Sequence, residues 1–222
     1  MSFSVIFDMD GTLFQTNKIL EPALDATFDH LKSLNMWDQP APIEIYRQIM
    51  GAPLPFVWER LMPDHSETDR QATNSLFHEH LLAHISSGKG DLYPGVEEVL
   101  QHLVDKGYPI YIASNGQIEY LKAIIDYYKL DRWVTETFSI SQIASLSKSD
   151  LVRSIKDKYK IDNGAVIGDR LSDIRAGQDN GLISIGCNFD FAQADELAQA
   201  DVVINRIVEL KIAIKELTRK SS

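Results

Sequence analysis

The chain has 222 residues, is 44% hydrophobic and 24% charged, and carries a formal net charge of −10 at pH 7. Values of this kind are typical of a globular protein that can bury a sizeable core, and they exclude a disordered or low-complexity chain. The acidic balance disfavours a nucleic acid polymer as partner, because such a partner requires a broad basic surface, and it favours small molecules instead.

The first predicted element is a strand at residues 3–7, FSVIF, whose apolar and β-branched residues are typical of a buried strand. It runs directly into two carboxylates, Asp8 and Asp10, with Gly11 behind them. Like charges so close to a buried strand repel one another unless another group balances them. This pair is therefore the first candidate for a functional site.

Residues 16–89 have a different character, because they contain no convincing strand and several amphipathic helical stripes. One stripe includes Leu24 and Phe28, and a later helix is predicted to begin at Ser66, with Asp69 as the acid of a capping box. We therefore predict a helical cap domain at residues 16–89, inserted after the first strand.

The rest of the chain alternates between short apolar runs and amphipathic helices. Further strands are predicted at residues 108–114, 164–169, 182–187 and 201–205, and helices over residues 96–104, 121–128 and 151–159. This alternation indicates right-handed crossovers and a parallel sheet with helices on both faces. The predicted fold class is therefore α/β, with a doubly wound, Rossmann-like core made from residues 1–15 and 90–222.

Cys187 is the only cysteine, so it closes no disulfide within the chain, and without an evident histidine partner it is expected to be a packed thiol. His80 and His84 have a spacing that can hold a metal, but no further ligand cluster accompanies them, so we expect surface histidines of the cap. The N-terminus lacks a secretory signal pattern, and no apolar run is long enough to cross a bilayer. We expect a cytoplasmic protein that is not bound to a membrane and acts as a monomer or weak homodimer.

Polar side chains follow three of the predicted strands, and a lysine begins the helix before the third of them: Asp8 and Asp10, Ser114 and Asn115, Asp169 and Asp173, and Lys148. In an open parallel sheet the loops after the strands converge at one edge, and ligands bind there. We therefore expect these side chains to share one site.

Several carboxylates at one point raise one another's pKa unless a cation is shared between them. Their hard oxygen atoms suit Mg²⁺, which typically takes one or two protein carboxylates, several waters and a substrate phosphate. With Mg²⁺ and Lys148 present, the site becomes attractive to a phosphate dianion. Ser114 and the backbone amides near Gly11 and Gly116 are further candidate donors to phosphate oxygens.

At these residues the sequence resembles the haloacid dehalogenase superfamily, in its cap-bearing phosphatase branch. The family's motif Asp-x-Asp-Gly-Thr matches residues 8–12, its Ser or Thr after the second strand matches Ser114, its lysine matches Lys148, and its Gly-Asp-x-x-x-Asp element matches residues 168–173. The resemblance covers residues 1–15 and 90–210, and residues 16–89 look like the family's cap. Members often carry another Asp shortly after the first motif, where this chain has Gln15, Thr16 and Asn17, which leaves the cap hinge and the substrate contacts open. They often have Pro after the lysine, where this chain has Ser149, which leaves the subgroup open.

The resemblance implies that Asp8 attacks phosphorus to form an aspartyl-phosphate, while Asp10 protonates the leaving oxygen and later activates water. It implies that the side chains of Asp8 and Asp169 and the backbone carbonyl of Asp10 hold Mg²⁺, with Asp173 supporting them from nearby. Ser114, Asn115 and Lys148 are the expected phosphate-binding residues.

Simpler interpretations stay open for single residues. Asp8 and Asp10 could form a polar turn, Ser114 with Asn115 could cap a helix, and Asp173 could be a first-turn acid that interacts with the helix dipole.

Among functions, we predict an Mg²⁺-dependent phosphatase for a small phosphorylated metabolite, with phosphoglycolate or a nucleoside monophosphate as plausible substrates. Asp10 argues against haloacid dehalogenases and phosphonatases, which resemble this pattern but lack the second Asp. A receiver-type signalling domain, in which Asp8 is only phosphorylated, does not account for Asp10, the cap or the Gly-Asp-x-x-x-Asp element. A sugar-phosphate mutase similar to β-phosphoglucomutase shares all four motifs and remains the alternative.

Overall fold

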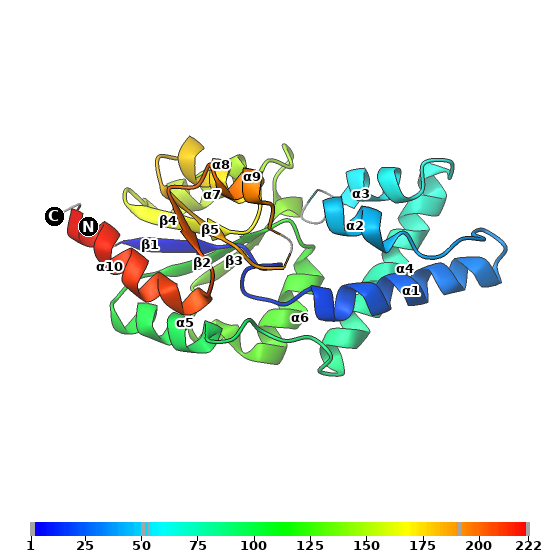
Figure 1. Cartoon of the computed structure of the whole chain (residues 1–222), viewed down its shortest axis with the longest axis horizontal. Helices are drawn as coiled ribbons and strands as arrows, with labels where there is room; N and C mark the ends of the chain where they lie inside the picture. The colour runs from blue at the N-terminus through cyan, green and yellow to red at the C-terminus, as the bar shows by residue number, and fades with distance from the viewer. Residues whose placement is uncertain (1–2, 50–51, 53, 191, 221–222) are drawn as a thin grey trace. The chain divides into compact units, whose positions relative to one another are not determined.

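The computed structural model describes residues 3–49, 52, 54–190 and 192–220, and the chain divides into two compact units. One unit, the core unit, comprises Met1–Gln15 and Leu92–Ser222, and the other, the helical unit, comprises Thr16–Asp91 (Figure 1). The chain thus returns to the core unit at Leu92, whereas the sequence placed the return at residue 90.

The core unit is built on one six-stranded sheet in which every strand pairing is parallel. Its strands are β1 (Ser4–Phe7), β2 (Ile110–Ser114), β3 (Glu136–Ser139), β4 (Gly164–Gly168), β5 (Ile183–Cys187) and β6 (Val202–Ile204). The strand order is β3-β2-β1-β4-β5-β6, so β1 lies between β2 and β4 and the order reverses at this point. The doubly wound α/β fold predicted from the sequence is confirmed, and β3 is a strand that the prediction missed.

Helices cover both faces of this sheet. They are α5 (Val96–Asp105), α6 (Ile118–Tyr128), α7 (Lys148–Tyr159), α8 (Leu171–Asp179), α9 (Ala194–Leu197) and α10 (Leu210–Lys220). In Figure 1, α7 and α8 lie above the sheet while α5 and α10 lie below it. Ile6 of β1 belongs to the buried cluster formed with α7, and its neighbours Val5 and Phe7 are fully buried as well, as expected for a strand with both faces covered.

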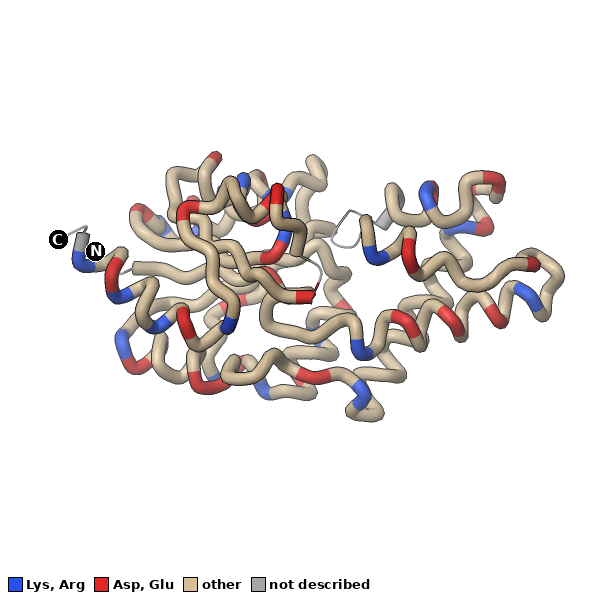
Figure 2. Tube along the Cα trace, in the orientation of Figure 1, with Lys and Arg blue, Asp and Glu red and all other residues tan. Residues whose placement is uncertain are grey.

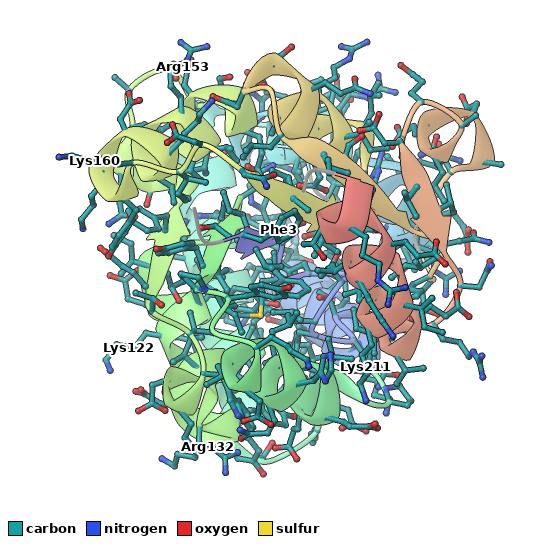
Figure 3. The ribbon with its side chains drawn as sticks, turned by 90° about the vertical axis from the view of Figure 1, so that its left-hand side faces the viewer. Phe3, Lys122, Arg132, Arg153, Lys160 and Lys211 are labelled. Carbon is teal, nitrogen blue, oxygen red and sulfur yellow. The ribbon has the colours of Figure 1, made fainter. Side chains whose placement is uncertain are left out.

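Apart from Asp8, Lys148, Asp169 and Asp173, the charged side chains in the described part of this unit are exposed or half-buried. Figure 3 shows Phe3 near the centre of the view, whereas four labelled basic side chains lie at its periphery: Lys122, Arg132, Arg153 and Lys160. Phe3 is buried, and its ring packs edge-on against that of Tyr108, with 5.7 Å between the ring centroids. The core at the amino end of β1 is therefore apolar, whereas the buried charged residues lie at the carboxyl ends of the strands and in the helices next to them.

The helical unit contains α1 (Asn17–Ser33), α2 (Ile43–Ile49), α3 (Leu54–Leu61) and α4 (Glu67–Ser86), and no strand among its described residues. Ser66 and Asp69 form the predicted capping box at the start of α4, and α4 packs on α1. Trp58 is buried, and its indole Nε1 donates to Asn74 Oδ1 over 2.7 Å. Of the helices in the part of the chain described here, none combines the length and apolar character needed to cross a membrane.

The chain leaves and re-enters the core unit at one place. Phe14 forms an antiparallel bridge with Leu92, the Tyr93 amide donates to the Leu13 carbonyl over 3.0 Å, and Gln15 Nε2 donates to the Leu92 carbonyl over 2.5 Å. Gln15 thus ties the outgoing segment to the returning one.

Candidate active site

Three buried carboxylates meet at the carboxyl edge of the sheet. Asp8 follows β1, Asp169 follows β4, and Asp173 lies in the first turn of α8; each offers an oxygen within 4.8 Å of the others. Their relative exposures are 7%, 0% and 1%, respectively. The strands β1 and β4 are paired directly, with Phe7 opposite Ile167, so the residues that follow them are neighbours. The structure therefore brings together these three residues that the sequence singled out.

Lys148 completes this group. It is the first residue of α7, is only 6% exposed, and places Nζ 2.8 Å from Asp8 Oδ1 and 2.9 Å from Asp173 Oδ1. Ser147 precedes it as the helix N-cap and accepts a hydrogen bond from the Asp150 amide. Lys148 is thus a buried ion-pair partner of two carboxylates rather than a solvated surface lysine.

Burial and crowding set the charges of the site. Loss of solvent, opposed by Lys148 and reinforced by the Asp173 and Asp10 carboxylates, raises the pKa of Asp8 to about 7. Burial also raises the pKa of Asp169 well above its usual range, and the charges of Asp173 and Asp8 add to the effect. Burial alone lowers the pKa of Lys148, but the carboxylates of Asp173 and Asp8 outweigh it and raise that pKa overall. Elsewhere both signs of charge are interspersed along the helices (Figure 2), and Asp8, Asp169 and Asp173 are the buried acids in the part of the chain that the structure describes.

The donor set fits a hard divalent cation. Asp169 Oδ2 is buried and accepts no hydrogen bond from the described residues, while Oδ1 accepts one from Thr12 Oγ1 over 3.3 Å. Gly11 closes over the same carboxylate: its φ is +73°, and a Cβ there would lie 2.5 Å from Oδ2. A buried carboxylate oxygen without a donor, beside further carboxylate oxygens, is a suitable ligand for Mg²⁺ or a similar ion.

Asp10 lies beside the three carboxylates but is not part of that group. Its Oδ1 accepts a hydrogen bond from the phenol of Tyr120 on α6, with 2.5 Å between the oxygens. Tyr120 was not predicted from the sequence, because a tyrosine in an amphipathic helix carries no spacing signal. Only the fold brings it to a partner 110 positions away.

Ser114 ends β2 and is buried. Its Oγ accepts from the Gly116 amide over 3.0 Å, and the N-cap of α6 is Gln117, so the interpretation of Ser114 with Asn115 as a helix cap is wrong. A serine hydroxyl that accepts one hydrogen bond can still donate its own hydrogen to a ligand. Asn115 follows it in the loop and is half-buried.

Burial and grouping bear on three further interpretations. Asp173 is indeed a first-turn acid, since its Oδ2 accepts from the Arg170 amide over 3.1 Å, and it belongs to the carboxylate group at the same time. Cys187 is a fully buried free thiol whose pKa is raised by burial, which confirms the packed-thiol prediction. His80 and His84 are half-buried rather than fully exposed, and in the described ranges the only set of three or more potential metal ligands is Asp8, Asp169 and Asp173.

Comparisons with known proteins agree with this geometry. The family model of haloacid dehalogenase-like hydrolases matches residues 4–181. The fold and the site together define the class: a hydrolase with a doubly wound sheet and buried carboxylates where the strand order reverses. The chain belongs to the haloacid dehalogenase-like hydrolase family.

Individual relatives are distant but cover nearly the whole chain. The chain is 22% identical to pyrophosphatase PpaX of Listeria monocytogenes, over 96% of each chain. It is 21% identical to a 5′-nucleotidase of Pseudomonas aeruginosa, over 87% of this chain and 86% of that one, and 26% identical to phosphoglycolate phosphatase of Neisseria gonorrhoeae, over 89% and 85%. The crystal structure of a predicted phosphoglycolate phosphatase from Haemophilus somnus has a TM-score of 0.84 and 18% identity, over 96% of this chain and 98% of that one.

Proposed function

We propose that this hydrolase is an Mg²⁺-dependent phosphatase that cleaves a small phosphomonoester through an aspartyl-phosphate on Asp8. The observation that carries the proposal is the burial of Asp8 against Lys148, beside Asp169 and Asp173. Such a group is costly to bury unless it binds an ion and an anionic substrate. The names of the relatives, pyrophosphatase, 5′-nucleotidase and phosphoglycolate phosphatase, support a phosphate substrate.

In the first half-reaction a carboxylate oxygen of Asp8 attacks phosphorus, and the bond between phosphorus and the ester oxygen breaks. The leaving oxygen keeps the electron pair and takes a proton from Asp10. In the second half-reaction Asp10 removes a proton from water, which attacks phosphorus and releases phosphate from Asp8. A carboxylate is a competent nucleophile here, because phosphoryl transfer depends mainly on positioning and charge neutralisation.

The proposed ion is Mg²⁺, held by the Asp8 and Asp169 side chains and the Asp10 backbone carbonyl, with Asp173 supporting from nearby. The ion supplies positive charge that lets these carboxylates and a phosphate occupy one site. Lys148 contributes a buried cation that orients Asp8 and faces the transferring group. Ser114 and Asn115, at the end of β2, are the proposed donors to the phosphate oxygens.

The substrate is proposed to be a small metabolite such as phosphoglycolate or a nucleoside monophosphate, and the helical unit is proposed to be the cap that contacts the leaving group. The mutase alternative retains the same core chemistry and differs only in the acceptor of the phosphoryl group. A cytoplasmic location and a monomeric or weakly dimeric state stay predictions.

The test is a phosphate-release screen of the purified protein with Mg²⁺. The panel contains phosphoglycolate, nucleoside monophosphates, pyrophosphate and hexose monophosphates, with an Asp8→Asn variant and excess chelator as controls. We expect release from at least one substrate that both controls abolish. A protein that releases no phosphate but isomerises a sugar phosphate when given the bisphosphate would instead be a mutase, and activity that persists in both controls would contradict the proposed mechanism.

A further inference from the structure

Tyr120 is a buried residue of the core unit that the proposed mechanism does not use. It is 4% exposed, and its hydroxyl donates to Asp10 Oδ1 over 2.5 Å. That length is within the short range typical of a hydroxyl that donates to a carboxylate. A strong contact to the proposed acid and base of the reaction calls for a functional explanation.

The tyrosine side of this contact is held firmly. Helix α6 begins directly behind the loop that follows β2, and a Cβ on Gly116 would lie 3.0 Å from Tyr120 Cδ1 and 3.1 Å from Leu121 Cδ2. Ser139 Oγ fixes the same loop by donating to the Gly116 carbonyl over 2.6 Å. Glycine at position 116 thus allows α6 to approach the loop closely, and this approach sets where the phenol oxygen lies.

The backbone of Asp10 is held as well. The Gly11 amide donates to the Phe14 carbonyl over 3.0 Å, and the Leu13 and Phe14 amides donate to the Met9 carbonyl over 3.0 and 2.9 Å. Asp10 itself forms a bridge with Phe14. The backbone that carries the carboxyl group is therefore fixed, and the hydrogen bond from the phenol restricts how the carboxyl group turns about its side-chain bonds.

We propose that Tyr120 is a positioning residue that orients the Asp10 carboxyl group for proton transfer; this rests on the proposed phosphatase mechanism. Because the phenol donates to Oδ1, the proton of the neutral carboxylic acid resides on Oδ2. As the ester bond breaks, the leaving oxygen takes this proton from Oδ2, and the phenol stabilises the carboxylate that remains. In the second half-reaction the same carboxylate, held in the same orientation, accepts a proton from water.

The test is the Tyr120→Phe variant, which keeps the ring and removes only the hydroxyl. The kinetic constant kcat/KM is measured for phosphomonoesters whose leaving alcohols span a wide pKa range. It reports the steps up to departure of the leaving group, where protonation matters most for poor leaving groups. We expect a loss of about tenfold for alkyl phosphates and less than about twofold for p-nitrophenyl phosphate, since positioned general acids contribute 10²–10⁴-fold in total.

Two comparisons make the outcome decisive. Tyr159→Phe is the matched control, because it removes another phenol–carboxylate hydrogen bond, the one to Glu136 at the amino end of β3. This variant should leave the dependence on the leaving group unchanged. In a double-mutant cycle, Tyr120→Phe should cause little further loss once Asp10→Asn is present, because the tyrosine acts through Asp10. An equal loss for all leaving groups, or full additivity with Asp10→Asn, would overturn the inference.

The same data separate this inference from the proposed function. If Asp10→Asn itself shows no dependence on the leaving group, the acid role of Asp10 is wrong and the proposed mechanism fails. If Asp10→Asn shows it and Tyr120→Phe does not, the mechanism stands and only the role of Tyr120 fails.

Discussion

The two edges of the sheet in the core unit pair the same kinds of charge with opposite results. At the carboxyl edge, Lys148 is shared between Asp8 and Asp173 away from solvent, and the pKa of Asp8 is raised to about 7. At the amino end of β3, Glu136 pairs with Lys158 and accepts from the Tyr159 hydroxyl, and the pKa of Glu136 is lowered. The side chains of Lys158 and Glu136 are 52% and 34% exposed.

Two physical differences explain this contrast. Solvent reaches the pair at Glu136, and one carboxylate there has two donors, so its ionised form is favoured. At Asp8 several carboxylates compete for one lysine in a dry site, so the ionised form is disfavoured. A crowded group of buried charges, as at Asp8, is a sign of function, whereas an exposed ion pair, as at Glu136, is ordinary surface structure.

The largest difference between the two edges is expected when one carboxylate is neutralised at each of them. Asp8→Asn should lower phosphate release by at least about 10⁴-fold, because an amide cannot act as the nucleophile. Glu136→Gln, the same chemical change at the other edge, should leave kcat within about twofold, as expected for a surface substitution. Steady-state assays on the best substrate of the screen decide the matter, and an active Asp8→Asn protein would remove the basis for the contrast.

Replacing Lys148 or Lys158 compares how much each edge contributes to the free energy of unfolding. Lys148→Met should destabilise the metal-free protein by about 3–5 kcal/mol, because it leaves buried carboxylates without their cation. Lys158→Met removes an exposed ion pair and should change stability by less than about 1 kcal/mol. Urea unfolding followed by circular dichroism measures both, and similar losses for the two variants would show that the buried lysine has no special role.

A divalent ion should act on one edge only. An ion present at 100 times its dissociation constant stabilises the folded state by about 2.7 kcal/mol, which corresponds to a Tm increase of roughly 5–10 °C for a chain of this size. Differential scanning fluorimetry should show this increase for the wild type and for Lys158→Met and lose most of it for Asp169→Asn. An equal shift in all three proteins would place the ion elsewhere.

The smallest expected effects are in the pH dependence of stability without metal. The folded-state pKa of Asp8 is raised above its unfolded value, so this group lowers stability as pH rises from about 4 through about 7. Asp8→Asn should weaken this trend, to which the raised pKa of Asp169 also contributes. The folded-state pKa of Glu136 is lowered, so its contribution is present above the unfolded pKa and is lost as pH falls through the folded one. Tm measured across this range for wild type, Asp8→Asn and Glu136→Gln checks both signs, and a trend unchanged in Asp8→Asn would refute the first.

The sequence predicted the strands that are made of apolar runs, and it missed β3, Glu136–Ser139, because this short edge strand begins with polar residues. It also missed α3, Leu54–Leu61, since prolines at positions 53 and 55 suggest a turn, although proline is tolerated in the first turn of a helix. The grouping of Asp8, Asp169 and Asp173 could be predicted from the sequence, because the ends of parallel strands converge. The contact of Tyr120 with Asp10 could not be predicted, because only the packing of α6 on the loop after β2 brings the two residues together.

The bridge between Phe14 and Leu92 has a consequence for modular evolution. Since the outgoing and returning segments are already paired there, the path of the core unit closes without residues 16–91. Insertions whose ends lie side by side are exchanged with little disturbance to the host fold. A chimera that carries a helical module from another protein between Gln15 and Leu92 is therefore expected to fold and to keep the carboxylate–lysine site. It is expected to acquire the substrate selectivity of the protein that supplied the module.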